Sequence, residues 1–309
     1  MSNNEETDLS DLMEKPTAAS IAEDANTAVP STGPDVYGQY HPIETKAIMQ
    51  EKQKEFTEEL TKLQAPEGVL PDHATLWNDP SFRLLFLRCE VYHADRAAKR
   101  FVKYWERRLE LFGNDSISIQ SIDRVCLEMG YFRVVVPEDG VSRPYAFIDP
   151  SNLDKSRYTV PKMTKAVWFM LHSLFLENEV VSSKGLIALG YFANVTLSHF
   201  DRDLVKSVLG SLQGALPLRL SAMHGCNPPT IFRIIFPIVQ AFMQPRLRRR
   251  LVIHVGNDVV DQLVSKYNFK KENLPTEFGG YLVVDATKWA EERERKDSAR
   301  NRVSVEVEA

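Results

Sequence analysis

Apolar and polar positions follow two different patterns along the chain, and the change falls near Gly113. Before it, apolar residues recur every three or four positions, as in Ile48, Phe56, Leu60 and Leu63, and again in Ala97, Phe101, Tyr104, Trp105, Leu109 and Phe112. This spacing predicts amphipathic helices. Asp79-Pro80 can start one of them, and Gly113 can end the last. We therefore predict a small helical subdomain over residues 46–113.

After Gly113 the apolar residues gather in short runs that often have Gly or Pro at their edges. The strands predicted from these runs are 132–137, 143–149, 184–192, 220–225 and 251–256. Segments with helical patterning alternate with them, at 161–179, 200–214, 228–244 and 257–267. Alternation of strands and helices predicts an α/β domain, here residues 114–285, in which several neighbouring strands are parallel.

The two ends of the chain have few large apolar residues. Residues 1–45 are acidic and polar, so they cannot bury enough surface to offset their ordering entropy, and we expect a disordered tail. Residues 286–309 are dense in charge, and we expect them to form an exposed helix or a frayed end.

The segment 227–245, NPPTIFRIIFPIVQAFMQP, is unusual because its polar residues form only one narrow stripe. The stripe consists of Thr230, Arg233, Pro237, Gln240 and Gln244, and the other helical positions are apolar. A helix on the surface of a globular domain usually has a wider polar face. Two interpretations stay open: a helix enclosed by the core, or a lid over an apolar ligand cavity or lipid surface.

Arginines follow this segment directly, at positions 246, 248, 249 and 250. If the stretch is extended, Arg246, Arg248 and Arg250 share one side. A run of charges is most often a solvated edge. Beside so apolar a helix, the run also suits anionic lipid headgroups, to which arginine can bind in a bidentate way. No aromatic stacking series accompanies the arginines, so nucleic acid is not an expected partner.

Composition supports an ordinary intracellular chain. Of its 309 residues, 43% are hydrophobic and 26% charged, with a net charge of −4, which does not favour a general nucleic-acid binder. The three cysteines lie far apart and predict reduced thiols. The N-terminus lacks the order of a signal peptide, and no apolar run reaches the length of a membrane span. We expect a cytoplasmic protein that meets membranes peripherally.

Candidate catalytic chemistry is sparse. GSLQG at 210–214 does not meet the GxSxG pattern, and the seven histidines form no HExxH pair. His224 and His254 lie on the strands that flank the apolar segment, so we expect their imidazoles to approach each other as core or cavity-lining groups rather than as metal ligands. The sequence predicts no catalytic residue, metal or cofactor, and hence no enzyme.

Several motifs resemble the CRAL-TRIO family, also called Sec14-like lipid-transfer proteins. NLPTEFGG (273–280) is similar to the family's near-terminal LPxE(F/Y)GG signature. The stretch 216–256 is similar in order and spacing to the strand, gate helix and basic strand of tocopherol- and retinal-binding members. Upstream, 84–108 resembles the family's helical N-terminal module, although Glu90 stands where a basic residue is common. The resemblance covers residues 75–285.

The resemblance implies a non-catalytic carrier of a hydrophobic small molecule or phospholipid. Its fold would be an α/β CRAL-TRIO domain whose sheet floors an apolar pocket beneath a mobile gate helix, about 228–243, preceded by a small helical subdomain. The candidate lining residues are Phe147, Trp168, Phe169, Ile187, Leu189, Phe192, Ile231, Ile235, Phe236 and Val239. The residues that match the family's headgroup-binding positions are Arg219, Arg246, Arg248 and Arg250, which would contact anionic membranes, with phosphoinositides among the candidates.

Two departures from the family pattern narrow the class of ligand that we expect. Members that carry phosphatidylinositol have a Glu before the Arg at position 219 and a Thr in the basic stretch, whereas this chain has Leu218 and Leu247. The chain therefore resembles tocopherol- and retinal-type carriers more than phosphatidylinositol exchangers. Ala241 replaces a usual gate proline and Pro237 lies four residues earlier, which leaves the position of the gate hinge open. The alternative function is a ligand-free CRAL-TRIO scaffold that recruits proteins to membranes.

Overall fold

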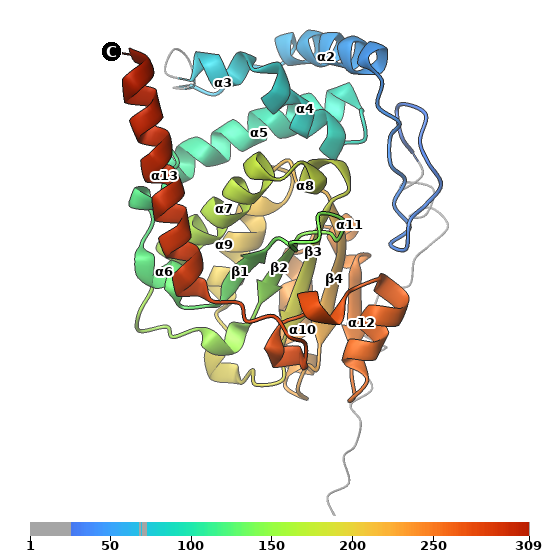
Figure 1. Cartoon of the computed structure of the whole chain (residues 1–309), viewed down its shortest axis with the longest axis vertical. Coiled ribbons are helices and arrows are strands. Elements are labelled where there is room, and N and C mark those ends of the chain that lie inside the picture. Colours follow the sequence, from blue (N-terminus) through green and yellow to red (C-terminus); the bar gives the residue numbers. More distant parts are fainter. Residues whose placement is uncertain (1–25, 68, 70–72, 309) are drawn as a thin grey trace, which may run out of the picture.

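The computed structural model describes residues 26–67, 69 and 73–308, with side chains described up to residue 299 (Figure 1). A layer of helices comes first in the chain, in the region predicted to be helical. Its members are α2 (Lys46–Thr61), α3 (Ala74–Asn78), α4 (Pro80–Cys89) and α5 (Ala94–Phe112). Its core is aromatic: the rings of Phe101, Tyr104 and Trp105 on α5 are fully buried, and Phe56 and Phe86 meet the Phe101 ring edge-on. The helical periodicity of α5 places these rings on one face.

Local sequence explains where these helices begin and end. The Asp79 carboxylate accepts a hydrogen bond from the Ser81 backbone N–H, and Pro80 takes the first helical position of α4. Gly113 ends α5 with a φ of +61°, a conformation that favours glycine.

A five-stranded sheet forms the centre of the second part of the chain. Its strands are β1 (Phe132–Val135), β2 (Tyr145–Ile148), β3 (Leu186–Tyr191), β4 (Leu220–Cys226) and β5 (Leu251–His254), in the spatial order β1-β2-β3-β4-β5. β1 is antiparallel to β2, and the other neighbours are parallel. The mixed, largely parallel sheet and all five predicted strands are confirmed.

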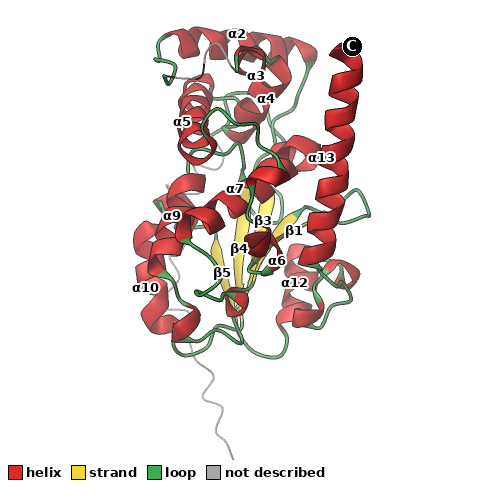
Figure 2. Ribbon diagram, turned by 90° about the vertical axis from the view of Figure 1, so that its left-hand side faces the viewer, coloured by secondary structure: helices red, strands yellow, loops and turns green. Residues whose placement is uncertain are grey.

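Helices connect the strands and cover both faces of the sheet. They are α6 (Arg124–Glu128), α7 (Val160–Glu177), α8 (Glu179–Ser183), α9 (Arg202–Leu212), α10 (Phe232–Phe242), α11 (Pro245–Arg248), α12 (Val259–Tyr267) and α13 (Ala286–Glu308). Single 3-10 turns lie at Ile119–Ser121, Pro150–Asn152, Leu197–His199, Lys271–Asn273 and Thr276–Phe278. Seen along the sheet, α9 and α10 lie on one side of the strands and α12 on the other (Figure 2).

The LPTEFGG motif closes the face of the sheet that α12 covers. Leu274 is fully buried, and the Phe278 ring packs 5.6 Å from that of Phe147. A Cβ at Gly280 would lie 2.1 Å from the Leu274 carbonyl oxygen, so only glycine fits there. The motif is thus a structural closure of the fold.

Both predicted tails differ from expectation where the structure describes them. Residues 1–25 lie outside the described residues, but 26–45 form a loop that folds back on itself and is bonded to the sheet domain. The polar composition of residues 26–45 did not predict this order, because the loop is held by partners far along the chain. Likewise α13 is more than an exposed helix: Ala290 is buried, and Asp297 accepts a hydrogen bond from the Ile119 N–H at 2.9 Å.

The predicted lid segment 228–244 is shorter than expected and is followed by a second helix. The helix α10 starts only at Phe232, because Asn227 has a φ of +51° and Pro228, which precedes another proline, is disfavoured in the helical conformation. After α10, Pro245 starts the single turn of α11 instead of an extended stretch. The expected extended row of Arg246, Arg248 and Arg250 on one side is therefore wrong, since residues two apart on a helix point in different directions.

A cavity beneath α10

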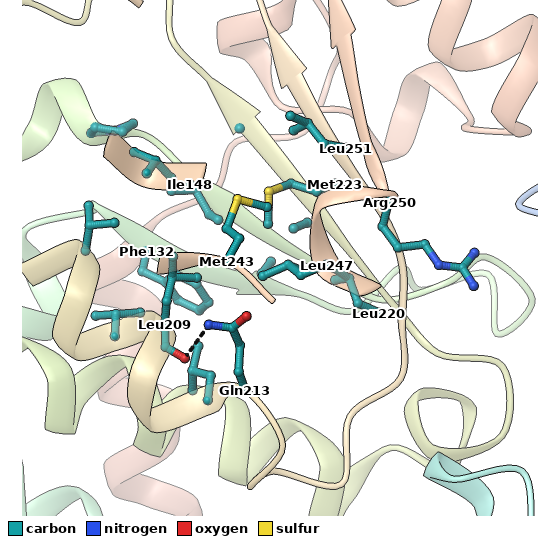
Figure 3. Close-up of a pocket in the computed structure, with 18 of the residues that line it drawn as sticks. Phe132, Ile148, Leu209, Gln213, Leu220, Met223, Met243, Leu247, Arg250 and Leu251 are labelled. Carbon is teal, nitrogen blue, oxygen red and sulfur yellow. Dashed lines mark hydrogen bonds between the residues drawn. The ribbon is translucent and has the colours of Figure 1, made fainter. Parts of the chain in front are cut away.

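A cavity of about 340 Å³ lies between the sheet and the helices α9 and α10. Its volume falls within the range of small-molecule sites. Most of the lining side chains are apolar. Figure 3 shows them arriving from separate elements, with Phe132 and Ile148 from β1 and β2, Met223 and Leu251 from β4 and β5, and Met243 from the end of α10. The cavity is therefore assembled by the tertiary fold rather than by any one segment.

Small residues on the sheet leave the space for this cavity. Ala146 on β2 and both Ala188 and Gly190 on β3 lie in its wall. A Cβ at Gly190 would lie 2.7 Å from the Phe192 ring, so glycine allows that ring to fold over the strand. Register explains why these positions share a face: Ala146 pairs with Ala188, and Ala188 pairs with Met223.

The opposite wall is one face of α10. Its lining residues recur at helical spacing: Phe232, Ile235, Phe236, Val239 and, just beyond the helix, Met243. The outer face of the same helix carries exposed apolar residues beside the polar stripe: Ile234 is 63% exposed and Ala241 is exposed, next to the exposed Arg233 and Pro237 of the stripe. Apolar residues on the cavity face and part of the outer face leave only a narrow polar stripe in the sequence.

The structure separates the predicted lining residues into two groups. Four of them line the cavity: Phe192, Ile235, Phe236 and Val239. Six do not: Phe147, Ile187, Leu189, Trp168, Phe169 and Ile231. The first three of these lie on the other face of the sheet, packed in the cluster that α12 covers. Strand residues alternate between the two faces of the sheet. These three large residues therefore point away from the cavity, and their small strand neighbours line it.

Trp168 and Phe169 of α7 pack against other helices instead of the cavity. The Trp168 ring stacks on Tyr104 of α5 at 5.4 Å, and Phe169 meets Trp289 of α13 edge-on. Ile231 is the residue before α10 and is outside the cavity wall. Sequence reasoning missed Ala146, Ala188 and Gly190, whose small size at alternate strand positions was the available signal.

One end of the cavity is polar and is lined by arginines from three parts of the chain. They are Arg100 on α5, Arg219 before β4, Arg246 on α11, and Arg250 before β5. Three of the four predicted headgroup arginines therefore meet here, and Arg248 does not line the cavity. Leu218 and Leu247, the two departures from the phosphatidylinositol pattern, also line the wall.

Glu90, at the end of α4, supplies a carboxylate to this polar end. It is 5% exposed, with one oxygen 2.5 Å from Arg100 and the other 3.5 Å from Arg246. Burial alone would raise the pKa of Glu90, but the charges of Arg100 and Arg246 hold it below its usual range. The carboxylate is therefore ionised at neutral pH and ties α11 to the helical layer.

Gln213 connects the end of α9 to the end of α10. Its side-chain amide donates to the Leu209 carbonyl oxygen at 3.0 Å (Figure 3) and to that of Phe242 at 2.9 Å, and its oxygen accepts from the Gln244 N–H at 2.7 Å. Arg248 adds a 3.0 Å hydrogen bond from Nε to the Met243 carbonyl oxygen. The C-terminal end of α10 is thus held by side-chain bonds.

The predicted approach of His224 and His254 is confirmed on the far face of the sheet. His224 Nδ1 lies 2.9 Å from His254 Nε2, and His254 Nδ1 lies 3.1 Å from the Gln262 amide oxygen. Burial, together with the neighbouring His254, lowers the pKa of His224 to about 3. The pair is therefore neutral at physiological pH and serves as a polar contact between two strands and α12.

Other site classes find little support in the described part of the chain. Within those residues, no group of three or more His, Cys, Asp or Glu side chains could hold a metal ion. None of the helices described has the length and apolarity to span a bilayer.

Comparisons with known proteins agree with this architecture. Residues 128–280 match the CRAL/TRIO domain model. Human "Alpha-tocopherol transfer protein-like" is 30% identical over 218 residues, which span 68% of this chain and 61% of that protein. Human "Clavesin-2" is 25% identical over 228 residues, covering 71% of this chain and 68% of the relative.

A solved structure shares the fold. The crystal structure of Sfh5 superimposes with a TM-score of 0.52 and 14% identity, over 82% of this chain and 97% of that one. The five strands, α10 and the LPTEFGG motif all lie within residues 128–280, the part of the chain that matches the domain model. Residues 128–280 therefore form a CRAL/TRIO domain, and the fold is Sec14-like.

Proposed function

We propose that this chain binds a hydrophobic small molecule or a phospholipid tail in the cavity beneath α10 and transfers it between membranes, with α10 as the gate. The observation that carries the proposal is the cavity itself, an apolar space between small sheet residues and one face of a helix. Transfer of this kind forms and breaks no covalent bond.

The cavity favours a ligand through the removal of apolar surface from water. Each Å² removed contributes about 25 cal/mol, so the ligand gains affinity in proportion to the surface that α10 covers. Release requires α10 to move, and a membrane that favours the open state can shift that equilibrium. The exposed Ile234, Pro237 and Ala241 on the outer face of α10 are suited to lipid contact.

Docking on anionic membranes is the second part of the proposal. Arg246, Arg248 and Arg250 follow α10 closely, and the Arg246 side chain is 40% exposed. Basic residues near an anionic surface contribute about 1 kcal/mol each. Arg219 lies at the same polar end of the cavity, where a headgroup would complete the site.

Whether the purified chain retains a bound ligand is tested by lipid extraction and by native mass spectrometry. We expect a stoichiometric apolar molecule in the wild type. Replacing Val239 by Trp should expel it, because Val239 lines the cavity. Ile234→Trp is the matched control, since Ile234 lies on the same helix but faces outward. A chain that carries no ligand in either form would support the scaffold alternative instead.

Docking is tested by co-sedimentation with anionic liposomes. Replacing Arg246, Arg248 and Arg250 together by Glu should abolish pelleting, while circular dichroism shows that the fold survives. Unchanged pelleting of a folded variant would remove the arginines from the docking role.

A further inference from the structure

The loop before α2 lies across the polar end of the cavity. Residues 31–43, here called the N-terminal strap, fold back on themselves through a bridge between Ser31 and Pro42 and a tight turn at 35–39. In Figure 1 the strap is part of the blue loop that descends from the start of α2. Gln39 of the strap is 1% exposed and forms part of the cavity wall.

Two of the cavity arginines donate hydrogen bonds to strap carbonyl groups. Arg219 Nη1 donates to the Tyr40 carbonyl oxygen at 2.7 Å, and Arg250 Nη1 donates to that of Tyr37 at 3.0 Å. Figure 3 shows the Arg250 guanidinium directed away from the apolar lining. Gln39 adds a bond in the reverse direction, from Nε2 to the Leu220 carbonyl oxygen at 3.1 Å.

Separate anchors hold the strap in place without involving these arginines. The Asp35 carboxylate forms an ion pair with Arg143 and lies 2.7 Å from His41. Tyr37 stacks on Tyr267 at 5.8 Å and donates its hydroxyl hydrogen to the Tyr267 carbonyl oxygen at 2.9 Å. These anchors can therefore be weakened while the arginines stay intact.

We propose that the N-terminal strap is a displaceable cover that competes with phosphate groups of membrane lipids for Arg219 and Arg250. This inference rests on the proposed docking function and adds a step that regulates docking. With the strap in place, Arg219 is only 5% exposed, so a phosphate at a membrane surface cannot reach it. The chain would dock fully only after the strap has moved.

The chemistry of the two acceptors favours exchange. A carbonyl oxygen presents only a dipole to a guanidinium, whereas a phosphate presents full negative charge and accepts bidentate hydrogen bonds. The described strap bonds to Arg219 and Arg250 are made by carbonyl oxygens. A membrane rich in phosphate monoesters therefore provides the stronger acceptor, and a neutral membrane leaves the strap in place.

The test measures binding of the full chain to phosphatidylcholine vesicles with and without phosphoinositide. A double variant, Asp35→Asn with Tyr37→Phe, removes the strap's ion pair and hydroxyl bond. It should bind phosphoinositide vesicles roughly three- to tenfold more tightly than the wild type. Asp154→Asn is the charge-matched control, because Asp154 is exposed and lies outside the strap.

Hydrogen exchange supplies the second measurement. The Thr32, Asp35 and Gly38 amides, bonded within the strap, should exchange faster when phosphoinositide vesicles are added and remain protected with phosphatidylcholine alone.

The outcomes separate the strap from docking itself. If Arg250→Gln weakens vesicle binding but the double variant and the strap amides are unchanged, the strap inference is wrong and docking stands. If Arg250→Gln and the triple Glu variant both bind normally, docking fails, and the strap has nothing to control.

Discussion

The two faces of the central sheet are built from neighbouring residues of the same strands yet differ in how they are filled. On the face toward α12, Phe147 and Leu189 are fully buried in a continuous apolar cluster. On the face toward α10, Ala146 and Ala188 leave a cavity. One face stabilises the fold by close packing, and the other keeps room for a ligand.

This difference shows how a carrier can combine stability with an unfilled space. Interiors are normally packed as densely as organic crystals, and a void loses the contacts of its lining. Here the cavity lies on the side of α10, and on the packed side Arg133 stacks 4.1 Å from the Phe147 ring. Substitutions on the two faces should therefore have different consequences.

The largest effect is expected on the packed face. Replacing Phe147 by Ala should lower the free energy of unfolding by about 3–5 kcal/mol, because it opens a cavity among residues that cannot collapse. Chemical denaturation measures the change. Ligand content per folded molecule should stay that of the wild type, since Phe147 does not line the cavity. A loss below about 1 kcal/mol would contradict the close packing of this face.

The second-largest effect is a loss of folding stability at low pH, caused by His224 on the packed face. An unfolded histidine has a pKa of about 6.5, whereas that of His224 is about 3 in the fold. As pH falls below 6.5, the unfolded chain takes up a proton that the folded chain does not. Stability is therefore lost between pH 6.5 and 3, by up to about 1.4 kcal/mol per pH unit for each such histidine.

Unfolding measured from pH 6.5 to 4.5 tests this expectation. His224→Asn should flatten the dependence in part, because His172, whose pKa burial also lowers to about 3, and His254, whose pKa burial lowers, still contribute to the slope. Identical slopes for variant and wild type would show that His224 is not buried in the neutral form.

The smallest effect is expected on the cavity face. Replacing Met223 by Ala should cost only about 1 kcal/mol, because this half-buried side chain already borders unfilled space. The enlarged cavity should accept a bulkier apolar ligand, which competition with fluorescent lipids of increasing size would show. A cost equal to that of Phe147→Ala would mean that the two faces are packed alike.

The sequence predicted the strands and most helices because apolar periodicity and Gly or Pro boundaries are local signals. It could not decide which face of each strand meets the cavity, since strands covered on both sides are apolar throughout. Phe147 and Ala146 are both buried. The two residues differ in size, and the cavity lies on the face to which the smaller one, Ala146, points.

Two other predictions were wrong, one for a long-range reason and one for a local reason. Residues 26–45 were expected to be disordered, but Tyr37, Gln39 and Asp35 find partners in the sheet domain. The arginines were expected to lie in one extended row, but Pro245 starts a helical turn. The polar end of the cavity still contains Arg219, Arg246 and Arg250, because the ends of β4, β5 and α10 meet there.

The N-terminal strap also has a consequence for the order in which the protein is completed during synthesis. All of its anchors lie later in the chain, and the contact between Tyr37 and Arg250 joins residues 213 positions apart. The strap is synthesised well before these partners, so it cannot settle until Tyr267 has been added and β5 has joined the sheet. Until then the polar end of the nascent cavity stays uncovered, so a newly made chain can meet a membrane before its own N-terminus shields it.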